Sequence, residues 1–323
     1  MHYVLITGAA GMLGRKLVDQ VVTDGGVSTF TLADIFAPIA PAGFDGDVRL
    51  EVADISSAEA AHQLINAKPD VIYHLAAIVS GEAEENFEKG NAINLDGTRN
   101  LLEAIRTKSA DGSYCPRFVF SSSLAVFGTP LPDLIPDDQR LTPLSSYGTQ
   151  KAMGELMVAD YSRKGFIDGI SLRLPTITVR PGKPNKAASG FYSGIIREPL
   201  NGEKAILPVP RTVRHWFQSP RRAIFNLAHA GRVKTDGLPK SRALSLPGVS
   251  ASVEEMIAAL ERAAGSIAIN LIQEEADDAI KNIVMGWPKA FAATTAIAMG
   301  FQGDAGFDEI IEIYLEDDAP SGS

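Results

Sequence analysis

Short apolar runs alternate with amphipathic stretches through the first half of the chain. The runs "HYVLITG", "STFTLADI", "PDVIYHLAA" and "PRFVFSSS" are rich in β-branched and aromatic residues and are typical of buried strands. Between them, "AAGMLGRKLVDQVVTDG", "SAEAAHQLINA" and "NLDGTRNLLEAIRT" carry apolar residues at helical spacing. Strands that alternate with helices predict a parallel sheet covered on both faces, and right-handed crossovers make that sheet doubly wound. The expected fold class is therefore α/β.

This rhythm ends after "GISLRLPTITVRPG", in which we place a strand at about residues 169–174. Beyond it, short strands such as "KAILPV" and "ALSLPG" mix with helices such as "SVEEMIAALERAAG" and "FDEIIEIYLED". We predict a sheet domain at residues 1–175, a smaller α/β substrate lobe at 176–318 with some chain crossing back to the sheet, and a flexible tail at 319–323. The junction of domain and lobe is the expected substrate cleft.

Composition narrows the function classes. The 323 residues are 45% hydrophobic and 21% charged, and no apolar run reaches the roughly 18 residues of a membrane span. A net charge of −9 argues against a nucleic-acid or membrane partner, whereas a small anion can still bind a locally basic pocket. The single cysteine, Cys115, and a start that goes straight into a strand lead us to expect a cytoplasmic protein. The five histidines are scattered, so we expect no metal site.

The segment "TGAAGMLG" places Gly8, Gly11 and Gly14 directly between the first strand and the first helix. The first glycine permits a tight turn, the second lets the backbone approach a pyrophosphate, and the third lets helix and strand pack closely. The start of the helix then offers free N–H groups and a positive dipole end to the phosphates. The sequence therefore predicts a Rossmann dinucleotide-binding domain.

A carboxylate follows at the expected distance. Asp34 ends the second strand about 20 residues past Gly14, where it can accept hydrogen bonds from the adenosine ribose. A carboxylate there repels a 2′-phosphate, which favours NAD over NADP; the alternative is a solvated turn aspartate. Asp54 and Ile55, in "VADIS", are candidates for holding the adenine.

The stretch "YGTQK" suggests proton chemistry. Tyr147 and Lys151 are four residues apart and share one helix face. A nearby ammonium favours the phenolate, which can take a proton from an alcohol as hydride leaves its carbon. The serines of "FSSS" sit at a strand's carboxyl end, where open parallel sheets bind ligands, and one of them can hold the same oxygen. The alternatives are a partly buried aromatic beside a snorkelling lysine, and a serine-rich turn.

The set "TGAAGMLG", "ADI", "HLAA", "FSSSLAVFG" and "YGTQK", in this order and spacing, resembles the extended short-chain dehydrogenase/reductase family over essentially the whole chain. The resemblance implies NAD as cofactor, and it implies Ser123, Tyr147 and Lys151 as catalytic residues. It implies cofactor contacts from Gly8, Gly11, Met12, Leu13, Asp34, Asp54, Ile55, Leu75, Ala76, Ala77, Ser80, Asn94, Tyr147, Lys151, Pro175 and Ile177.

The resemblance also bears on support and assembly. Asn94 is expected to support the catalytic helix, and His74 is expected to be a packed strand-end residue. Ser80 is expected to touch cofactor or substrate, with capping of the following acidic helix as the alternative. Two helices, around residues 85–107 and 146–164, are expected to pair with their copies in a homodimer, as is common in the family.

Basic residues of the second lobe suggest an anionic substrate. Arg180, Lys183, Arg214 and His215 form a cationic set, and arginine forks bind carboxylates bidentately. The alternative for Lys183, and for Arg221 and Arg222, is surface charge. Within the family, "HLAAIVSGEAE", "RLPTITVRPGKPN" and "RHWFQSPR" look like the branch that oxidises the four-carbon sugar acid D-erythronate with NAD. That likeness implies oxidation of the C2 hydroxyl to a 2-keto acid, with substrate contacts from Ser80, Ser123, Tyr147, Thr178, Arg180 and Arg214.

Two other functions remain open. A nucleotide-sugar epimerase or dehydratase keeps NAD bound and reduces and reoxidises it in each cycle. Against it, "AVFG" has Phe127 where such epimerases usually carry tyrosine, and "RLPTITVRPGKPN" lacks their N-x-Y-G-P pattern. A non-catalytic NAD-sensing regulator is the minor alternative, although such proteins commonly lose the tyrosine or the lysine and this chain keeps both.

Overall fold

The structure is a computed structural model that describes residues 2–182 and 189–319. The chain forms two compact units. The sheet unit comprises Met1–Val126, Ser145–Arg173 and Ile224–Leu244, and the second unit comprises Phe127–Leu144, Leu174–Ala223 and Ser245–Ser323. Of the predicted tail at 319–323, only Ala319 lies within the described residues.

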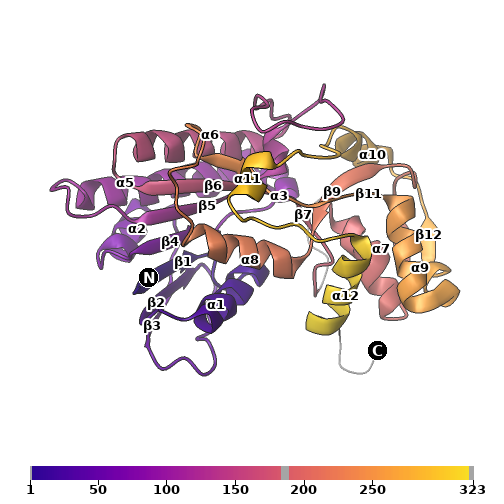
Figure 1. Cartoon of the computed structure of the whole chain (residues 1–323), viewed down its shortest axis with the longest axis horizontal. Helices are drawn as coiled ribbons and strands as arrows, with labels where there is room; N and C mark the ends of the chain where they lie inside the picture. Colours follow the sequence, from indigo (N-terminus) through magenta and orange to yellow (C-terminus); the bar gives the residue numbers. More distant parts are fainter. Residues whose placement is uncertain (1, 183–188, 320–323) are drawn as a thin grey trace. The chain divides into compact units, whose positions relative to one another are not determined.

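A seven-stranded sheet, in the order β10-β6-β5-β4-β1-β2-β3, forms the first unit (Figure 1). The pairs from β5 through β4, β1 and β2 to β3 are parallel. The strands are β1 (Tyr3–Thr7), β2 (Thr29–Asp34), β3 (Asp47–Val52), β4 (Val71–His74), β5 (Arg117–Ser123), β6 (Asp168–Leu174) and β10 (Ala243–Ser245). The predicted doubly wound α/β fold is confirmed.

Helices cover this sheet on both faces. The helices α2 (Ala58–Ile65), α5 (Gly97–Lys108) and α6 (Ser146–Arg163) contact one another in sequence, and α6 packs on β5. Figure 1 shows α1 (Met12–Asp24) and α8 (Pro220–Ala230) on the other face. Because both faces are covered, successive residues of the central strands are buried, as at Val4, Leu5 and Ile6 of β1. Burial of each such side chain contributes roughly 1.5–3 kcal/mol.

The helix predicted around residues 85–107 is wrong as a single regular element. The chain instead forms α3 (Ser80–Glu85), α4 (Phe87–Gly90), the π-helix η1 (Asn91–Asp96) and then α5. A close approach marks the end of η1, since a Cβ on Gly97 would lie 2.8 Å from the Cδ1 of Ile55. Single-turn π segments are frequent at functional sites, and this one carries the buried Asn94.

The second unit contains two small sheets, ordered β11-β9-β7 and β12-β8. Their strands are β7 (Thr176–Ile177), β8 (Ala205–Leu207), β9 (Arg214–Gln218), β11 (Val249–Ser252) and β12 (Ile272–Glu274). The helices around them are α7 (Gly190–Leu200), α9 (Val253–Ile269), α10 (Asp278–Met285), α11 (Thr294–Ala298) and α12 (Phe307–Asp317). A core that includes Tyr192, Phe217, Met256 and Ile310 joins α7, β9, α9 and α12.

One strand expected in the smaller lobe belongs to the central sheet instead. The segment "ALSLPG" contains β10, which lies beside β6, and the Ser171 N–H donates to the Arg242 carbonyl at 2.7 Å next to it. The backbone of β6 is therefore hydrogen-bonded on this edge of the sheet. Buried backbone N–H and C=O groups need such partners.

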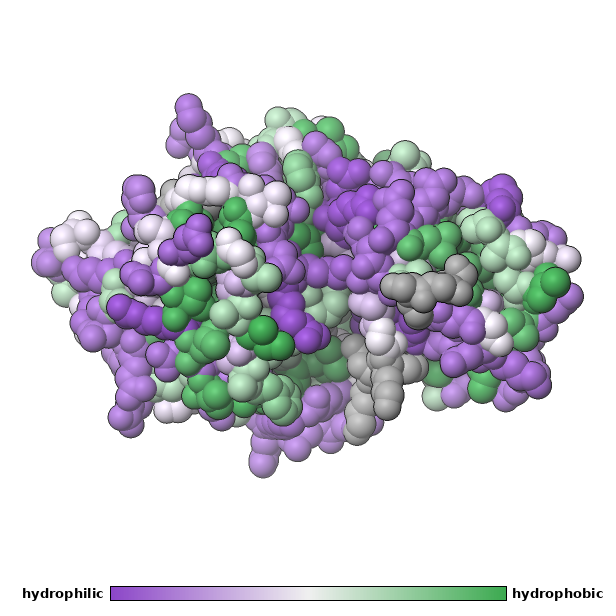
Figure 2. Space-filling model, turned by 90° about the horizontal axis from the view of Figure 1, so that it is seen from below, coloured by the Kyte–Doolittle hydropathy of each residue, from purple (hydrophilic) through white to green (hydrophobic). Residues whose placement is uncertain are grey.

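The described surface is mixed in polarity. Figure 2 shows apolar residues set among hydrophilic ones on the face seen from below. In the part of the chain that the structure covers, no helix is long and apolar enough to pass through a membrane.

Candidate active site

The glycine turn between β1 and α1 has no room for larger residues. Gly8 has φ +79°, and a Cβ there would lie 2.7 Å from the Ala76 nitrogen. A Cβ on Gly14 would lie 2.2 Å from the Gly8 carbonyl oxygen. The N–H groups of Gly8 and Ala9 both donate to the Ala33 carbonyl, at 2.9 and 3.2 Å, which fixes the turn on β2. The turn thus has the close backbone packing that the sequence predicted.

The start of α1 fits the pyrophosphate of a dinucleotide. Its N-cap, Gly11, has no side chain to cap the first N–H groups, and no acidic residue lies in the first turn. The helix therefore presents its first backbone donors and its positive dipole end without a competing carboxylate. Met12 and Leu13 are partly exposed at this point, and their contacts with the cofactor stay predictions.

Asp34 is joined to the same turn. Its Oδ2 accepts a hydrogen bond from the Ala10 N–H at 3.0 Å, and its Oδ1 accepts one from the Phe36 N–H at 3.2 Å. These bonds orient a partly exposed carboxylate at the end of β2, the position predicted for a ribose acceptor. The turn, the start of α1 and Asp34 together fit NAD.

The remaining cofactor candidates of the sheet unit lie after β3 and β4. Asp54 is exposed and its Oδ1 accepts from the Ser56 N–H, whereas Ile55 is buried against Gly97. Leu75 extends β4 by donating its N–H to the Thr7 carbonyl at 3.0 Å. Partly exposed side chains follow it in the "HLAA" segment at Ala76 and Ala77. Their contacts with NAD stay predictions.

Two supporting residues behave differently from each other. Asn94 bonds the backbone of Ile78 through Oδ1 at 2.9 Å, and its Nδ2 donates to Gln150 of α6 at 2.8 Å. It therefore supports α6 as expected. Ser80 is the first residue of α3 behind the N-cap Val79 and makes no side-chain cap, so the capping alternative for Ser80 is wrong.

Helix α6 carries the predicted acid/base pair. It begins behind Ser145, whose Oγ accepts from the Gly148 N–H at 3.1 Å. The Lys151 Nζ lies 5.7 Å from the ring centre of Tyr147 and 4.9 Å from that of Phe120. Because residues four apart share a helix face, both functional groups of the pair point toward the carboxyl end of β5.

The three serines of β5 have three different partners, so the serine-rich turn is excluded as an explanation. Ser121 Oγ donates to the His74 carbonyl at 3.0 Å, and the Ser121 carbonyl accepts from Lys151 Nζ at 2.8 Å. Ser122 Oγ donates to Glu155 at 2.5 Å. Ser123 Oγ accepts from the Ala125 N–H at 3.2 Å, and its hydroxyl lies close enough to the Tyr147 phenol to lower the pKa of that phenol. This proximity fits the role predicted for Ser123.

The electrostatics correct one expectation. Burial raises the pKa of the Tyr147 phenol to about 12, and the nearby Ser123 hydroxyl only partly opposes this rise. Burial also lowers the pKa of the Lys151 ammonium to about 7. The phenol is therefore protonated in the protein alone, because burial disfavours its charged form, and activation by the Lys151 ammonium stays a prediction for the enzyme with bound cofactor and substrate.

His74 is a packed residue, as expected. Its Nδ1 lies 2.8 Å from Thr7 Oγ1 and its Nε2 lies 2.9 Å from Thr98 Oγ1. Burial, together with the charge of Lys151, lowers the pKa of its imidazole to about 3. The ring is therefore neutral and structural at physiological pH.

Sequence reasoning missed a buried ion pair in this region. Arg173 of β6 binds the carboxylate of Glu155 bidentately, with Nη2 2.7 Å from Oε2 and Nε 2.9 Å from Oε1. The available signal was the spacing, since Glu155 lies four residues beyond Lys151 on the same helix face.

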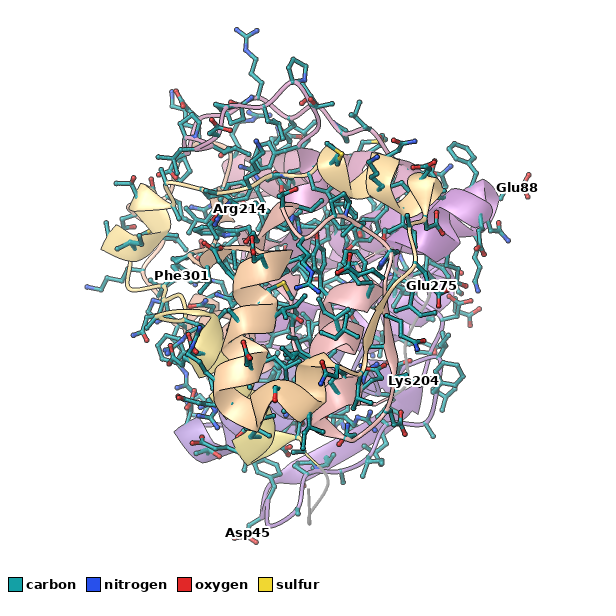
Figure 3. All side chains as sticks on the ribbon, turned by 90° about the vertical axis from the view of Figure 1, so that its right-hand side faces the viewer. Asp45, Glu88, Lys204, Arg214, Glu275 and Phe301 are labelled. Atoms are coloured by element: carbon teal, nitrogen blue, oxygen red, sulfur yellow. The ribbon has the colours of Figure 1, made fainter. Side chains whose placement is uncertain are left out.

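The predicted substrate residues of the second unit differ in how they are held. Thr178 is buried, and its Oγ1 lies 3.0 Å from Ser193 Oγ. Arg214 already has partners within the protein, because it donates to the Glu255 carboxylate at 2.9 Å and to the Ser250 carbonyl at 3.0 Å. Figure 3 shows Arg214 near the start of α9. Pro175 is buried and Ile177 is half-buried in β7.

Arg180 is the exception among these cations. Its side chain is half-buried, and no carboxylate among residues 2–182 and 189–319 pairs with its guanidinium. Burial lowers the pKa of this group, and the nearby Arg197 lowers it further. Arg197 itself donates to the Arg180 carbonyl at 2.7 Å and forms an ion pair with Glu198. A partly desolvated guanidinium without a carboxylate can receive an anion.

The other basic residues that the sequence singled out differ from Arg180. His215 is buried, stacks on Tyr192 and bonds Thr176 at 2.7 Å, and burial lowers its pKa to about 3, so assigning it a positive charge was wrong. Arg221 and Arg222 form ion pairs with acidic residues, which fits the surface-charge alternative. Lys183 lies outside the described residues.

In the part of the chain that is described, no group of three acidic, histidine or cysteine side chains could hold a metal ion.

A Rossmann sheet with a glycine turn, an aspartate at the end of β2 and a Ser–Tyr–Lys cluster is typical of dinucleotide-dependent enzymes. The model of the NAD dependent epimerase/dehydratase family matches residues 4–217. The chain belongs to the NAD-dependent epimerase/dehydratase family, and NAD is its cofactor.

Three relatives extend this assignment. A protein of Cupriavidus necator named D-erythronate dehydrogenase is 45% identical over 97% of this chain and 98% of its own length. A Haemophilus influenzae protein of the same name is 43% identical over 98% and 99%. A crystal structure described as that of a nucleoside-diphosphate-sugar epimerase from Agrobacterium tumefaciens is 53% identical, with a TM-score of 0.95 over 98% of this chain and 94% of that chain.

We predict that Tyr147→Phe abolishes turnover, by at least about 100-fold, while NAD binding is kept. The substitution removes only the hydroxyl that is predicted to exchange the proton with substrate. Steady-state NADH formation measures the first quantity and fluorescence titration with NADH the second. Thr149→Val, an exposed change on the same helix, is the matched control. Retained turnover in Tyr147→Phe would show that another group moves the proton.

Proposed function

We propose that this protein oxidises the C2 hydroxyl of a small sugar acid of the D-erythronate type to the 2-keto acid, with NAD as the oxidant. The observation that carries the proposal is the cluster of Ser123, Tyr147 and Lys151 at the end of β5. Support for the substrate class comes from two relatives named D-erythronate dehydrogenase, each matched over nearly its full length.

The residues divide the chemistry in a defined way. Ser123 and Tyr147 hold the substrate hydroxyl between two oxygens, and Tyr147 accepts its proton. NAD, when bound, supplies the hydride acceptor and a positive charge on the nicotinamide. The Lys151 ammonium stabilises the phenolate form of Tyr147, and it keeps donors for the nicotinamide ribose after its bond to the Ser121 carbonyl.

Recognition of the acid is assigned to Arg180. Its half-buried guanidinium has no carboxylate partner among the described residues. A bound substrate carboxylate therefore compensates for the water that this charge has lost on burial. Thr178 and Ser80 are proposed as further contacts. Arg214 is proposed as a weaker one, because Glu255 and Ser250 already accept its donors.

A nucleotide-sugar epimerase is the second candidate, and the name of the similar Agrobacterium tumefaciens protein favours it. An epimerase returns the hydride to its substrate, so it releases no NADH. Against this candidate, Phe127 packs on Phe291 with ring centres 5.5 Å apart and has no hydroxyl to offer a sugar.

We also infer a cytoplasmic homodimer. Helix α6 exposes Met153 and Leu156, at 42% and 66%, and Phe87 of α4 is 62% exposed. Apolar side chains on an outer helix face fit pairing with a second copy, and a single cysteine fits a reducing compartment.

The proposal is tested by incubating the protein with NAD and a panel of four- and five-carbon aldonic acids, and separately with UDP- and dTDP-sugars. Absorbance at the NADH band follows net oxidation. We expect NADH with D-erythronate or a stereoisomer and none with nucleotide sugars. Epimerised nucleotide sugar without NADH release would contradict the proposal in favour of the second candidate.

Arg180→Ala is expected to raise the KM for the sugar acid at least about tenfold, because a charge-assisted bidentate contact is lost. The KM for NAD should stay within about twofold. Arg211→Ala, which removes an exposed arginine paired with Glu274, is the matched control. Equal KM values for the acid in Arg180→Ala and the unmodified protein would exclude Arg180 from substrate binding.

The dimer is tested by light scattering after size-exclusion chromatography. Leu156→Glu places a charge on the exposed apolar face of α6 and is expected to yield monomers at micromolar concentration. Leu315→Glu, at a 41% exposed site of the second unit, is the control and should remain dimeric. A monomeric unmodified protein would refute the inferred homodimer.

A further inference from the structure

An ion pair removed from water lies next to the proposed catalytic lysine. Glu155 and Arg173 have side chains only 3% and 6% exposed, and the arginine fork binds both carboxylate oxygens. Ser122 Oγ adds a third donor to Glu155, at 2.5 Å. The carboxylate is thereby fixed by two strands, β5 and β6, while it belongs to α6.

A contribution to the stability of the fold does not by itself explain this ion pair. Desolvating two charges costs several kcal/mol each, and replacing a buried pair by apolar residues is often neutral or stabilising. Its place on the helix suggests another use. Tyr147, Lys151 and Glu155 follow at intervals of four residues, so their side chains form one row along α6, with neighbouring Cβ atoms about 5–6 Å apart.

We propose that Glu155 is a positioning residue for the oxidation: its carboxylate, held by Arg173 and Ser122, keeps Lys151 in the charged form and aligned with Tyr147. The kinetic consequence rests on the proposed function, whereas the effect on Lys151 does not. The role follows from the row of three side chains and from the anchoring of the last one.

The surroundings of Lys151 agree with this role. His74 of β4 is neutral, Tyr147 is uncharged in the protein alone, and Ser121 of β5 offers only a carbonyl. Glu84 of α3 is bound to the Ser146 N–H at the start of α6. Among the described residues, Glu155 is the charged group that acts on the pKa of Lys151: burial lowers this pKa to about 7, and the carboxylate opposes the shift.

The sign of the effect follows directly. A carboxylate stabilises the ammonium, so its removal lowers the pKa of Lys151 further and the charge is lost at a lower pH. The experiment is NADH binding, followed by fluorescence as a function of pH, in the full-length protein and in Glu155→Gln. We expect the midpoint at which affinity falls on the alkaline side to move about one pH unit or more to lower pH. Asp160→Asn, an exposed charge loss on the same helix, should not move it.

Two further variants keep the test decisive. Glu155→Gln removes the carboxylate that the buried Arg173 binds, so the double variant Glu155→Gln/Arg173→Met removes both charges of the pair and protects folding. It should also show a downward shift, because the carboxylate that opposes the effect of burial on the pKa of Lys151 is absent there as well. Glu155→Asp keeps the charge and should keep the midpoint of the unmodified protein.

A purely structural ion pair gives a different result. It predicts a lower melting temperature with an unmoved midpoint in the folded double variant, and that result overturns the proposal. An equal shift in Asp160→Asn overturns it as well. NADH binding needs no turnover, so absence of activity on every sugar acid would refute the proposed function and leave this test intact. With an active substrate, the alkaline limb of kcat/KM should move in the same direction.

Discussion

The site depends on the docking of α6 against the carboxyl end of β5. The Lys151 amino group donates to the Ser121 carbonyl at 2.8 Å, Ser122 binds Glu155, and Ser123 lies close enough to Tyr147 to lower the pKa of its phenol. Each consecutive residue of the strand thus faces a different turn of the helix. Because the polar groups involved are largely removed from water, each needs its partner, and the helix has one satisfactory position on the strand.

The cofactor half of the site uses the same edge of the sheet. The glycine turn follows β1, Asp34 ends β2, and the "HLAA" segment follows β4, with Gly8 in close contact with Ala76. In a parallel sheet these carboxyl ends all lie on one side, so the turn after β1 and the end of β5 share one edge. The topology, more than any single residue, therefore places the predicted dinucleotide turn on the edge that carries the Tyr147 phenol.

Local signals were enough to predict much of this arrangement. Apolar runs and helical spacing predicted the doubly wound sheet, the glycine spacing predicted the turn, and a four-residue interval placed Tyr147 and Lys151 on one face. These features depend on short stretches of chain, in which each residue's neighbours are known from the sequence. The family resemblance added the assignment of Ser123 to its role.

The features that were missed depend on distant parts of the chain. Glu155 and Arg173 meet only because β6 lies beside β5 under α6, and His215 becomes neutral only because aromatic rings enclose it. The π-helix at 91–96 arises where Gly97 meets Ile55. The direction of the pKa shift of Tyr147 was missed for a similar reason. The neighbouring charge of Lys151 can be read from the sequence, whereas the burial that raises the pKa is a property of the folded chain.

In net oxidation, the hydride that leaves the substrate carbon is not returned to the substrate. In the proposed mechanism it leaves as Tyr147 accepts the hydroxyl proton. The direct measurement uses D-erythronate deuterated at C2, with mass spectrometry of both products. We expect one deuterium in the reduced nicotinamide released into solution for each molecule of 2-keto acid formed. Deuterium that stays in the sugar product, without reduced nicotinamide in solution, would contradict this mechanism.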